Sequence, residues 1–189
     1  MKSKMKNRPH DLAWRGTHME SKTMRGHEVP EKRAHNGKVF DLGGGAYQYV
    51  QYPETVHFQD SQGKWQEIDN RLVEHKSREG VPVLCNSQNL IAFEFAKQTQ
   101  DAALISICAK DGQRLSWTLQ GQRQGIPANV KSHTLRAQAD EDAKRADFSK
   151  VETSLTYEEI LPDTDLICHL QSMRFKDEIV LKTPQAPHL

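Results

Sequence analysis

The 189-residue sequence is poor in cysteine, and its three cysteines, Cys85, Cys108 and Cys168, are widely spaced. It contains no CxxC pair, so the spacing predicts neither a structural zinc site nor a thioredoxin-like redox centre. A disulfide framework would need a denser set of cysteines in even number. Because Cys108 and Cys168 lie inside apolar runs, we expect both to be small buried hydrophobic side chains. The run VPVLCNSQN leaves the surroundings of Cys85 open.

Long apolar runs are also absent, and none approaches the ~20 residues that a membrane-spanning helix requires. Residues 1–16 are basic but lack the apolar stretch of a secretory signal. We therefore expect a cytosolic protein, another export route, or a fragment whose signal lies elsewhere. The formal net charge of +1 gives no reason to expect nucleic acid or an anionic membrane as a partner.

Motifs that carry chemistry are missing as well. No serine lies in a GxSxG elbow, and no cysteine–histidine pair has a catalytic context. Gly43 to Gly45 lack the surroundings of a phosphate-binding loop, so we expect a turn that needs positive φ. We expect no cofactor, no metal and no enzymatic activity.

Residues 1–37 are crowded with charged side chains and show no sustained hydrophobic period. Such a segment buries too little apolar surface to offset its ordering entropy, so we predict a disordered or loosely docked leader. Its four histidines lack close ligand spacing and a nearby cysteine, which favours a solvated basic tail over a metal site. They are His10, His18, His27 and His35.

Residues 38–189 are predicted to form one β-rich module. Residues 38–73 combine alternating apolar residues with tight turns, as expected of an antiparallel meander. Further along, Asp111-Gly112 is a strong hairpin signal between residues 102–109 and 113–120, and residues 151–160, 165–171 and 175–181 alternate as strands. We expect a charged loop over 74–80, a loop over 121–130 and an exposed loop or marginal helix over 132–145. About ten short strands without a long helical pattern predict an all-β antiparallel sandwich or open barrel.

The candidate ligand-binding residues are three aromatic and two polar side chains, each with a structural alternative: Tyr47, Tyr49, Trp65, Asp69 and Asn70. Because Tyr47 and Tyr49 share a strand face, we expect them to pack in the core, while an outward-facing set would instead stack on sugar rings. For Asp69 and Asn70 we favour bonds to nearby backbone amides that build a turn.

Other polar side chains offer weaker candidates. His57 alternates with Val56 and Phe58, so we expect it to face solvent or a cross-strand partner. The acidic groups around residues 158–159 and 163–165 would suit paired-carboxylate catalysis only at the right separation, and calcium at the 162–165 turn lacks an EF-hand-like run.

Three segments together resemble a known family: VFDLGGGAYQYVQYPETVHFQDSQGKWQEIDNRLVE, LTYEEILPDTDLICHL and FKDEIVLKTP. They are similar to a β-rich module near the N-termini of bacterial RHS-repeat and wall-associated proteins, which often stands beside DNRLRE domains. The resemblance covers about residues 38–184, and Val56 to Asn70 is its most specific part. It implies an extracellular or cell-surface location and neighbouring domains of a larger polypeptide as partners. Relatives continue with more β structure, so we expect an incomplete module with an open sheet edge.

The leading hypothesis is therefore a non-catalytic structural or adhesive module of an RHS-type surface protein. The alternative is a carbohydrate-binding module, which would use exposed aromatic residues on cell-wall or surface carbohydrate. An enzyme such as a glycosidase is the third hypothesis, and no motif supports it.

Overall fold

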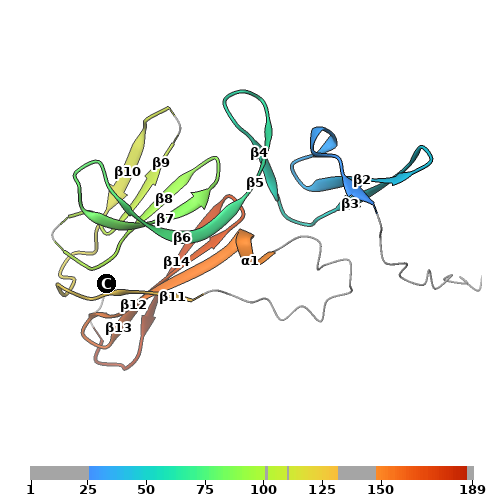
Figure 1. The fold of residues 1–189 in the computed structure, drawn as a ribbon. Coiled ribbons are helices and arrows are strands. Elements are labelled where there is room, and N and C mark those ends of the chain that lie inside the picture. The colour runs from blue at the N-terminus through green and yellow to red at the C-terminus, as the bar shows by residue number, and fades with distance from the viewer. Residues whose placement is uncertain (1–25, 101, 110, 132–147, 187–189) are drawn as a thin grey trace, which may run out of the picture.

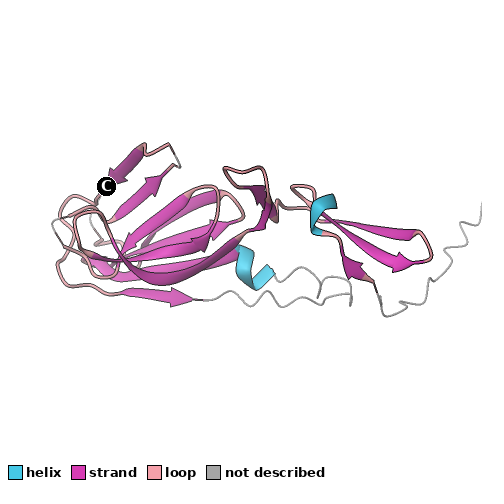
Figure 2. Cartoon of the chain, turned by 45° about the horizontal axis from the view of Figure 1, so that its top comes forward, coloured by secondary structure: helices cyan, strands magenta, loops and turns pink. Residues whose placement is uncertain are grey.

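The computed structural model describes residues 26–100, 102–109, 111–131 and 148–186, and these form four antiparallel sheets. Two sheets pack face to face as a sandwich, and two small sheets extend from one end of it (Figures 1 and 2). In this part of the chain the sheets of three, four and five strands are open, because the outermost strands of each do not pair with each other. The prediction of an all-β fold is confirmed. No helix among the described residues is long and apolar enough to cross a membrane.

The first layer of the sandwich has the strand order β10-β9-β8-β7-β6. Its strands are β6 (Asp69–Lys76), β7 (Pro82–Gln88), β8 (Ala92–Ala96), β9 (Ile105–Cys108) and β10 (Arg114–Trp117). The predicted hairpin between β9 and β10 is present, with Gly112 at a φ of 89°. Only a residue without a Cβ adopts such a left-handed conformation without strain.

The second layer has the order β11-β12-β13-β14, and a short helix lies between β11 and β12 in the chain. Its elements are β11 (Ala128–Lys131), α1 (Phe148–Val151), β12 (Glu152–Leu161), β13 (Thr164–Gln171) and β14 (Arg174–Leu181). The strands predicted from alternation at 151–160, 165–171 and 175–181 are therefore confirmed.

The core lies between the inner faces of these two layers. Phe93 and Phe95 of β8 meet Leu155 and Tyr157 of β12, and all four side chains are almost fully buried. Burying one side chain of this size stabilises the fold by roughly 1.5–3 kcal/mol. The Tyr157 hydroxyl also donates a 2.6 Å hydrogen bond to the Ala96 carbonyl, which joins the two layers inside the core.

The two small sheets are built from the N-terminal part of the chain. One contains β1 (His27–Glu28), β2 (Gly37–Gly43) and β3 (Ala46–Gln51), and the other contains β4 (His57–Gln59) and β5 (Trp65–Glu67). The 3-10 turn η1 (Pro30–Lys32) connects β1 to β2. The single meander expected over residues 38–73 was wrong, because β3 and β4 do not pair and β6 joins the sandwich.

Three further sequence predictions need correction. Residues 26–37 of the expected leader are ordered, because Val29 bonds to Val39 and the ion pairs described below hold this segment. Strand β6 runs to Lys76 into the expected loop over 74–80, and β11 begins at Ala128, inside the expected loop over 121–130, and pairs with β12. Residues 1–25 and the segment over 132–145 lie outside the described residues.

Candidate functional site

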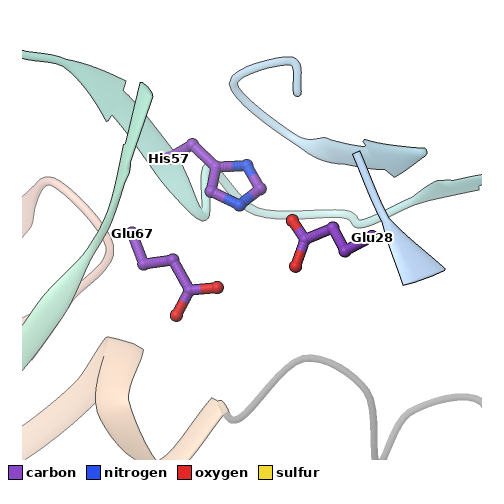
Figure 3. A group of neighbouring side chains, drawn as sticks. All are labelled: Glu28, His57 and Glu67. Atoms are coloured by element: carbon purple, nitrogen blue, oxygen red, sulfur yellow. The ribbon is translucent and has the colours of Figure 1, made fainter. Parts of the chain in front are cut away.

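A cluster of charged side chains lies where the two small sheets meet. The turn after β4, in which the Asp60 carboxylate accepts the amide hydrogens of Gln62 and Lys64, sets the β4–β5 register. In that register His57 lies directly opposite Glu67. Glu28 reaches the same place from β1, and Figure 3 shows the three side chains His57, Glu67 and Glu28 pointing toward one another.

Two cations neutralise the carboxylates of this cluster. Arg33 Nε bonds to Glu28 Oε1 at 2.6 Å, and Lys38 Nζ bonds to Glu67 Oε1 at 2.7 Å. Burial raises the pKa of both glutamates, but the bond from Arg33 to Glu28 and the bond from Lys38 to Glu67 outweigh it, so both pKa values lie below the usual range. Neither carboxyl therefore holds a proton near neutral pH, as the general acid of a glycosidase must.

His57 is buried in this cluster, so of its two expected positions the solvent-facing one was wrong, whereas the position opposite a cross-strand residue is confirmed by Glu67. Strand β4 is covered on both sides, since Val56 and Phe58 are buried as well. His57 Nδ1 lies 2.9 Å from the Ala34 carbonyl oxygen and donates its hydrogen to it. Burial lowers the pKa of His57, as do the nearby charges of Arg33 and Lys38, so the ring is neutral.

No residue in the described part of the chain bonds to the second ring nitrogen of His57. Nε2 is buried and accepts no hydrogen bond from any residue that the structure describes. With Nδ1 as the protonated nitrogen, Nε2 carries a free lone pair. A buried polar atom without a partner costs about 1–3 kcal/mol. Sequence reasoning missed this cluster because its members come from three separate strands.

Tyr47 and Tyr49 face solvent, so their expected place in the core was wrong. Their side chains are 52% and 53% exposed. Phe40 and Val50 occupy the opposite, covered face of this hairpin, which leaves the tyrosine face outward. Lys32 Nζ lies 3.7 Å from the ring centroid of Tyr47, where it makes a cation–π contact.

Trp65 does not join this tyrosine face. It is half-buried on β5, and its ring contacts His35 edge-on at a centroid distance of 5.0 Å. It also approaches the ring of His57 at 6.5 Å. Trp65 therefore packs beside the charged cluster and is not available as a flat platform.

Asp69 and Asn70 turn out to play different roles. Asp69 accepts a hydrogen bond from the Arg71 amide at 3.1 Å, which fits the predicted local role. Asn70 is fully buried and makes only long-range bonds, so its predicted local role was wrong. Its Nδ2 donates to the carbonyls of Val151 and Ser172 at 2.8 and 2.7 Å. Asn70 thus joins β6 to the residue before β12 and the residue after β13, which bond to each other at the open end of that hairpin.

A cavity of about 340 Å³ lies on the outer face of the five-stranded sheet. Small side chains, Arg114, Glu79 and Glu94 line it, and none of the described residues of its lining is aromatic and able to stack on a sugar. Arg114 bonds to the hydroxyls of Ser106 and Ser116 at 2.9 and 3.1 Å and pairs with Glu94 at 3.1 Å. The Arg114 guanidinium is therefore already bonded to side chains of the fold.

Two of the acidic residues around the β12–β13 turn, Glu159 and Asp165, are also paired with cations. Lys182 Nζ lies 2.7 Å from both Glu159 Oε1 and Asp165 Oδ1, and Arg123 adds a further contact to Glu159 at 3.3 Å. These two carboxylates neutralise a lysine and do not face each other across a cleft.

The three cysteines are free thiols. Cys168 is buried in the core as expected, whereas Cys108 is only half-buried because it lies on the outer face of β9. Burial raises the pKa of Cys85 to about 11 and that of Cys168 to about 12. Thiols with such pKa values carry little thiolate at neutral pH and are poor nucleophiles.

Comparison with known proteins finds no family model, no curated protein and no solved structure that matches this chain.

Proposed function

We propose that the chain is a non-catalytic β-sandwich module of a larger bacterial surface or secreted protein of the RHS type, and that it joins neighbouring β structure through strand β14. The observation that carries this proposal is the open edge of the second layer. Among the described residues, β14 has only β13 as a neighbour. Its last three residues are apolar yet well exposed, at 42%, 37% and 52% for Ile179, Val180 and Leu181.

The backbone of β14 offers hydrogen-bonding groups to a further strand. The Lys182 amide donates to the Asp163 carbonyl at 2.8 Å, which fixes the phase of the β13–β14 ladder. In an antiparallel pair, alternate residues bond to the partner strand and the others point away from it. Four backbone amides of β14 therefore point away from β13, toward the open edge of the sheet: Phe175, Asp177, Ile179 and Leu181. Such an edge is a template for strand addition.

Three polar side chains that could have bound a ligand instead make contacts within the fold, which supports a structural role. Asn70 joins the two sandwich layers, and Arg114 and Lys182 are paired with carboxylates. Residues 38–184 also resemble modules of RHS-repeat proteins. In those proteins further β structure adjoins the module, which fits strand addition at β14.

Amide hydrogen exchange resolved to single residues of β14 tests this proposal. In the isolated chain the four outward amides should exchange at least about tenfold faster than those of Lys176, Glu178 and Val180, which bond to β13. In the larger polypeptide isolated from its source cells, a neighbouring strand should bond to these four amides and slow their hydrogen exchange. If they exchange equally fast in both samples, β14 is not a docking edge and the proposal fails.

Carbohydrate binding is the second candidate function, and the exposed face of Tyr47 and Tyr49 favours it. Two aromatic rings on one face of a strand can stack on successive sugar rings. Retention of the chain on insoluble cell-wall polysaccharide should fall about tenfold in the Tyr47→Ala/Tyr49→Ala variant. Leu115→Ala is the matched control, because Leu115 is 65% exposed on the distant β9–β10 hairpin. Equal retention of all three proteins would exclude this function.

A further inference from the structure

The unpaired nitrogen of His57 faces two carboxylates that come from separate strands. Glu28, His57 and Glu67 each offer one ligand atom, and these atoms lie within 4.8 Å of one another. Figure 3 shows the imidazole and both carboxylates converging on one space. The burial of His57 and the lack of any partner for Nε2 set this group apart from an ordinary surface ion-pair cluster.

We propose that Glu28, His57 and Glu67 form a binding site for a divalent transition-metal ion, and that zinc suits the donors best. One imidazole nitrogen with two carboxylate oxygens is a donor set that zinc accepts, with a fourth position left for water. Calcium and magnesium prefer oxygen ligands alone, so the imidazole disfavours both ions.

The hydrogen bond on the other side of the ring supports this assignment. Histidines that bind a metal usually donate their second ring N–H to a carbonyl or carboxylate, which fixes the tautomer and the ring orientation. His57 makes this bond, from Nδ1 to the Ala34 carbonyl at 2.9 Å. The ring is thereby held with a free lone pair on Nε2, directed at the carboxylates.

Lys38 is the competitor for this site. Its Nζ lies 2.7 Å from Glu67 Oε1 and 3.5 Å from Glu28 Oε2, so it bridges the two carboxylates. With Arg33 it already neutralises both glutamates, and a divalent ion must displace the ammonium group before it can bind. Arg33 Nε can keep its bond to the other oxygen of Glu28, whereas the longer contact of Arg33 Nη2 with Glu67 Oε1, at 3.3 Å, must also give way to the ion. Removal of the Lys38 charge should therefore tighten metal binding.

The ion would fasten β1 to the β4–β5 hairpin. Glu28 belongs to β1, whereas His57 and Glu67 face each other across β4 and β5. Metal binding at this place does not depend on the open edge of β14 or on the tyrosine face.

Titration of the full chain with zinc chloride by calorimetry tests the site, with visible absorption of cobalt(II) as a second readout. We expect one ion per chain, with a dissociation constant in the micromolar range or tighter. Because each change removes a ligand, His57→Gln and Glu67→Gln should each weaken binding at least about tenfold. Lys38→Met should bind the ion several-fold more tightly than the natural chain.

Two further variants control for other histidines. His75→Gln removes an exposed histidine of β6, and His10→Gln/His18→Gln removes two histidines near the N-terminus. Both should bind zinc as the natural chain does. Absence of one-to-one binding, or binding that these changes abolish while His57→Gln retains it, overturns the proposal. Should His57→Gln unfold, Lys38→Met decides, because a purely structural ion-pair cluster gives no gain in metal affinity.

Discussion

Substitution of Asn70 by alanine should destabilise this protein more than any other single polar-to-alanine change in the sandwich. The carboxamide makes four hydrogen bonds in a fully buried position. Nδ2 donates to the carbonyls of Val151 and Ser172, and Oδ1 accepts from the side-chain amides of Asn86 and Asn89 at 3.1 and 2.8 Å. One side chain thus ties β6 to the ends of the β12–β13 hairpin and to the turn after β7.

The magnitude follows from these bonds. At about 1 kcal/mol net for each of four bonds, the loss is about 4 kcal/mol. The two carbonyls are not left bare, because Val151 still accepts from the Ser172 amide at 3.1 Å and Ser172 still accepts from Asn89 at 2.8 Å. One amide hydrogen of buried Asn86 loses its partner. We therefore expect the free energy of unfolding to fall by about 3–5 kcal/mol.

Urea denaturation followed by the fluorescence of the three tryptophans, Trp14, Trp65 and Trp117, measures this change. The midpoint should fall while the slope stays the same, because the surface exposed on unfolding is unchanged. Asn129→Ala is the control, since Asn129 is exposed on β11 and should change stability by less than about 0.5 kcal/mol. Asn70→Asp keeps the oxygen that accepts from Asn86 and Asn89 but sets a buried carboxylate against two carbonyls, so it should be at least as damaging as Asn70→Ala. A loss below about 1 kcal/mol for Asn70→Ala would refute the reasoning.

Three further predictions concern the core, the acid response and the thiols. Tyr157→Phe removes the buried bond to the Ala96 carbonyl and should lower the free energy of unfolding by about 1–2 kcal/mol in the same urea assay; an unchanged midpoint would contradict this. Burial raises the pKa of Asp165, but its bond to Lys182 outweighs burial, so the pKa lies below its usual range. Its contribution is therefore present above the unfolded pKa of about 3.9 and lost as pH falls through the folded value. Asp165→Asn should accordingly lose less stability between pH 5 and about pH 3, and parallel curves would disprove the pairing. Cys85, with its pKa raised to about 11, should react with iodoacetamide far more slowly at pH 8 in the folded chain than in urea, and equal rates would exclude the burial.

The elements that the sequence predicted correctly depend on short-range signals. The β9–β10 hairpin follows from Asp111-Gly112, whose glycine takes the positive φ that the turn requires. Strand β13 alternates Leu166, Cys168 and Leu170 toward the core, so its period is visible in the chain. Both signals arise within a few residues and need no knowledge of distant partners.

The errors share a different origin. Strand β4 is covered on both faces, so of the two positions expected for His57, solvent and a place opposite a cross-strand residue, only the second is found. The tyrosines of β3 alternate as a core stripe would, but Phe40 and Val50 fill the covered side of that hairpin. Periodicity shows that a strand has two faces, and it does not show which face another element covers.

The sequence by itself determined that this protein is all-β, where most of its strands begin and turn, and that its cysteines form no disulfide framework. Only the tertiary structure decided that Asn70 joins two layers, that residues 26–37 dock onto the β4–β5 hairpin, and that Glu28, His57 and Glu67 meet. The physical reason is the range of the interactions. Turn conformation and strand alternation are set by neighbouring residues. The hydrogen bonds of the buried Asn70 carboxamide and the contacts of the charged cluster instead depend on strands brought together by the whole fold.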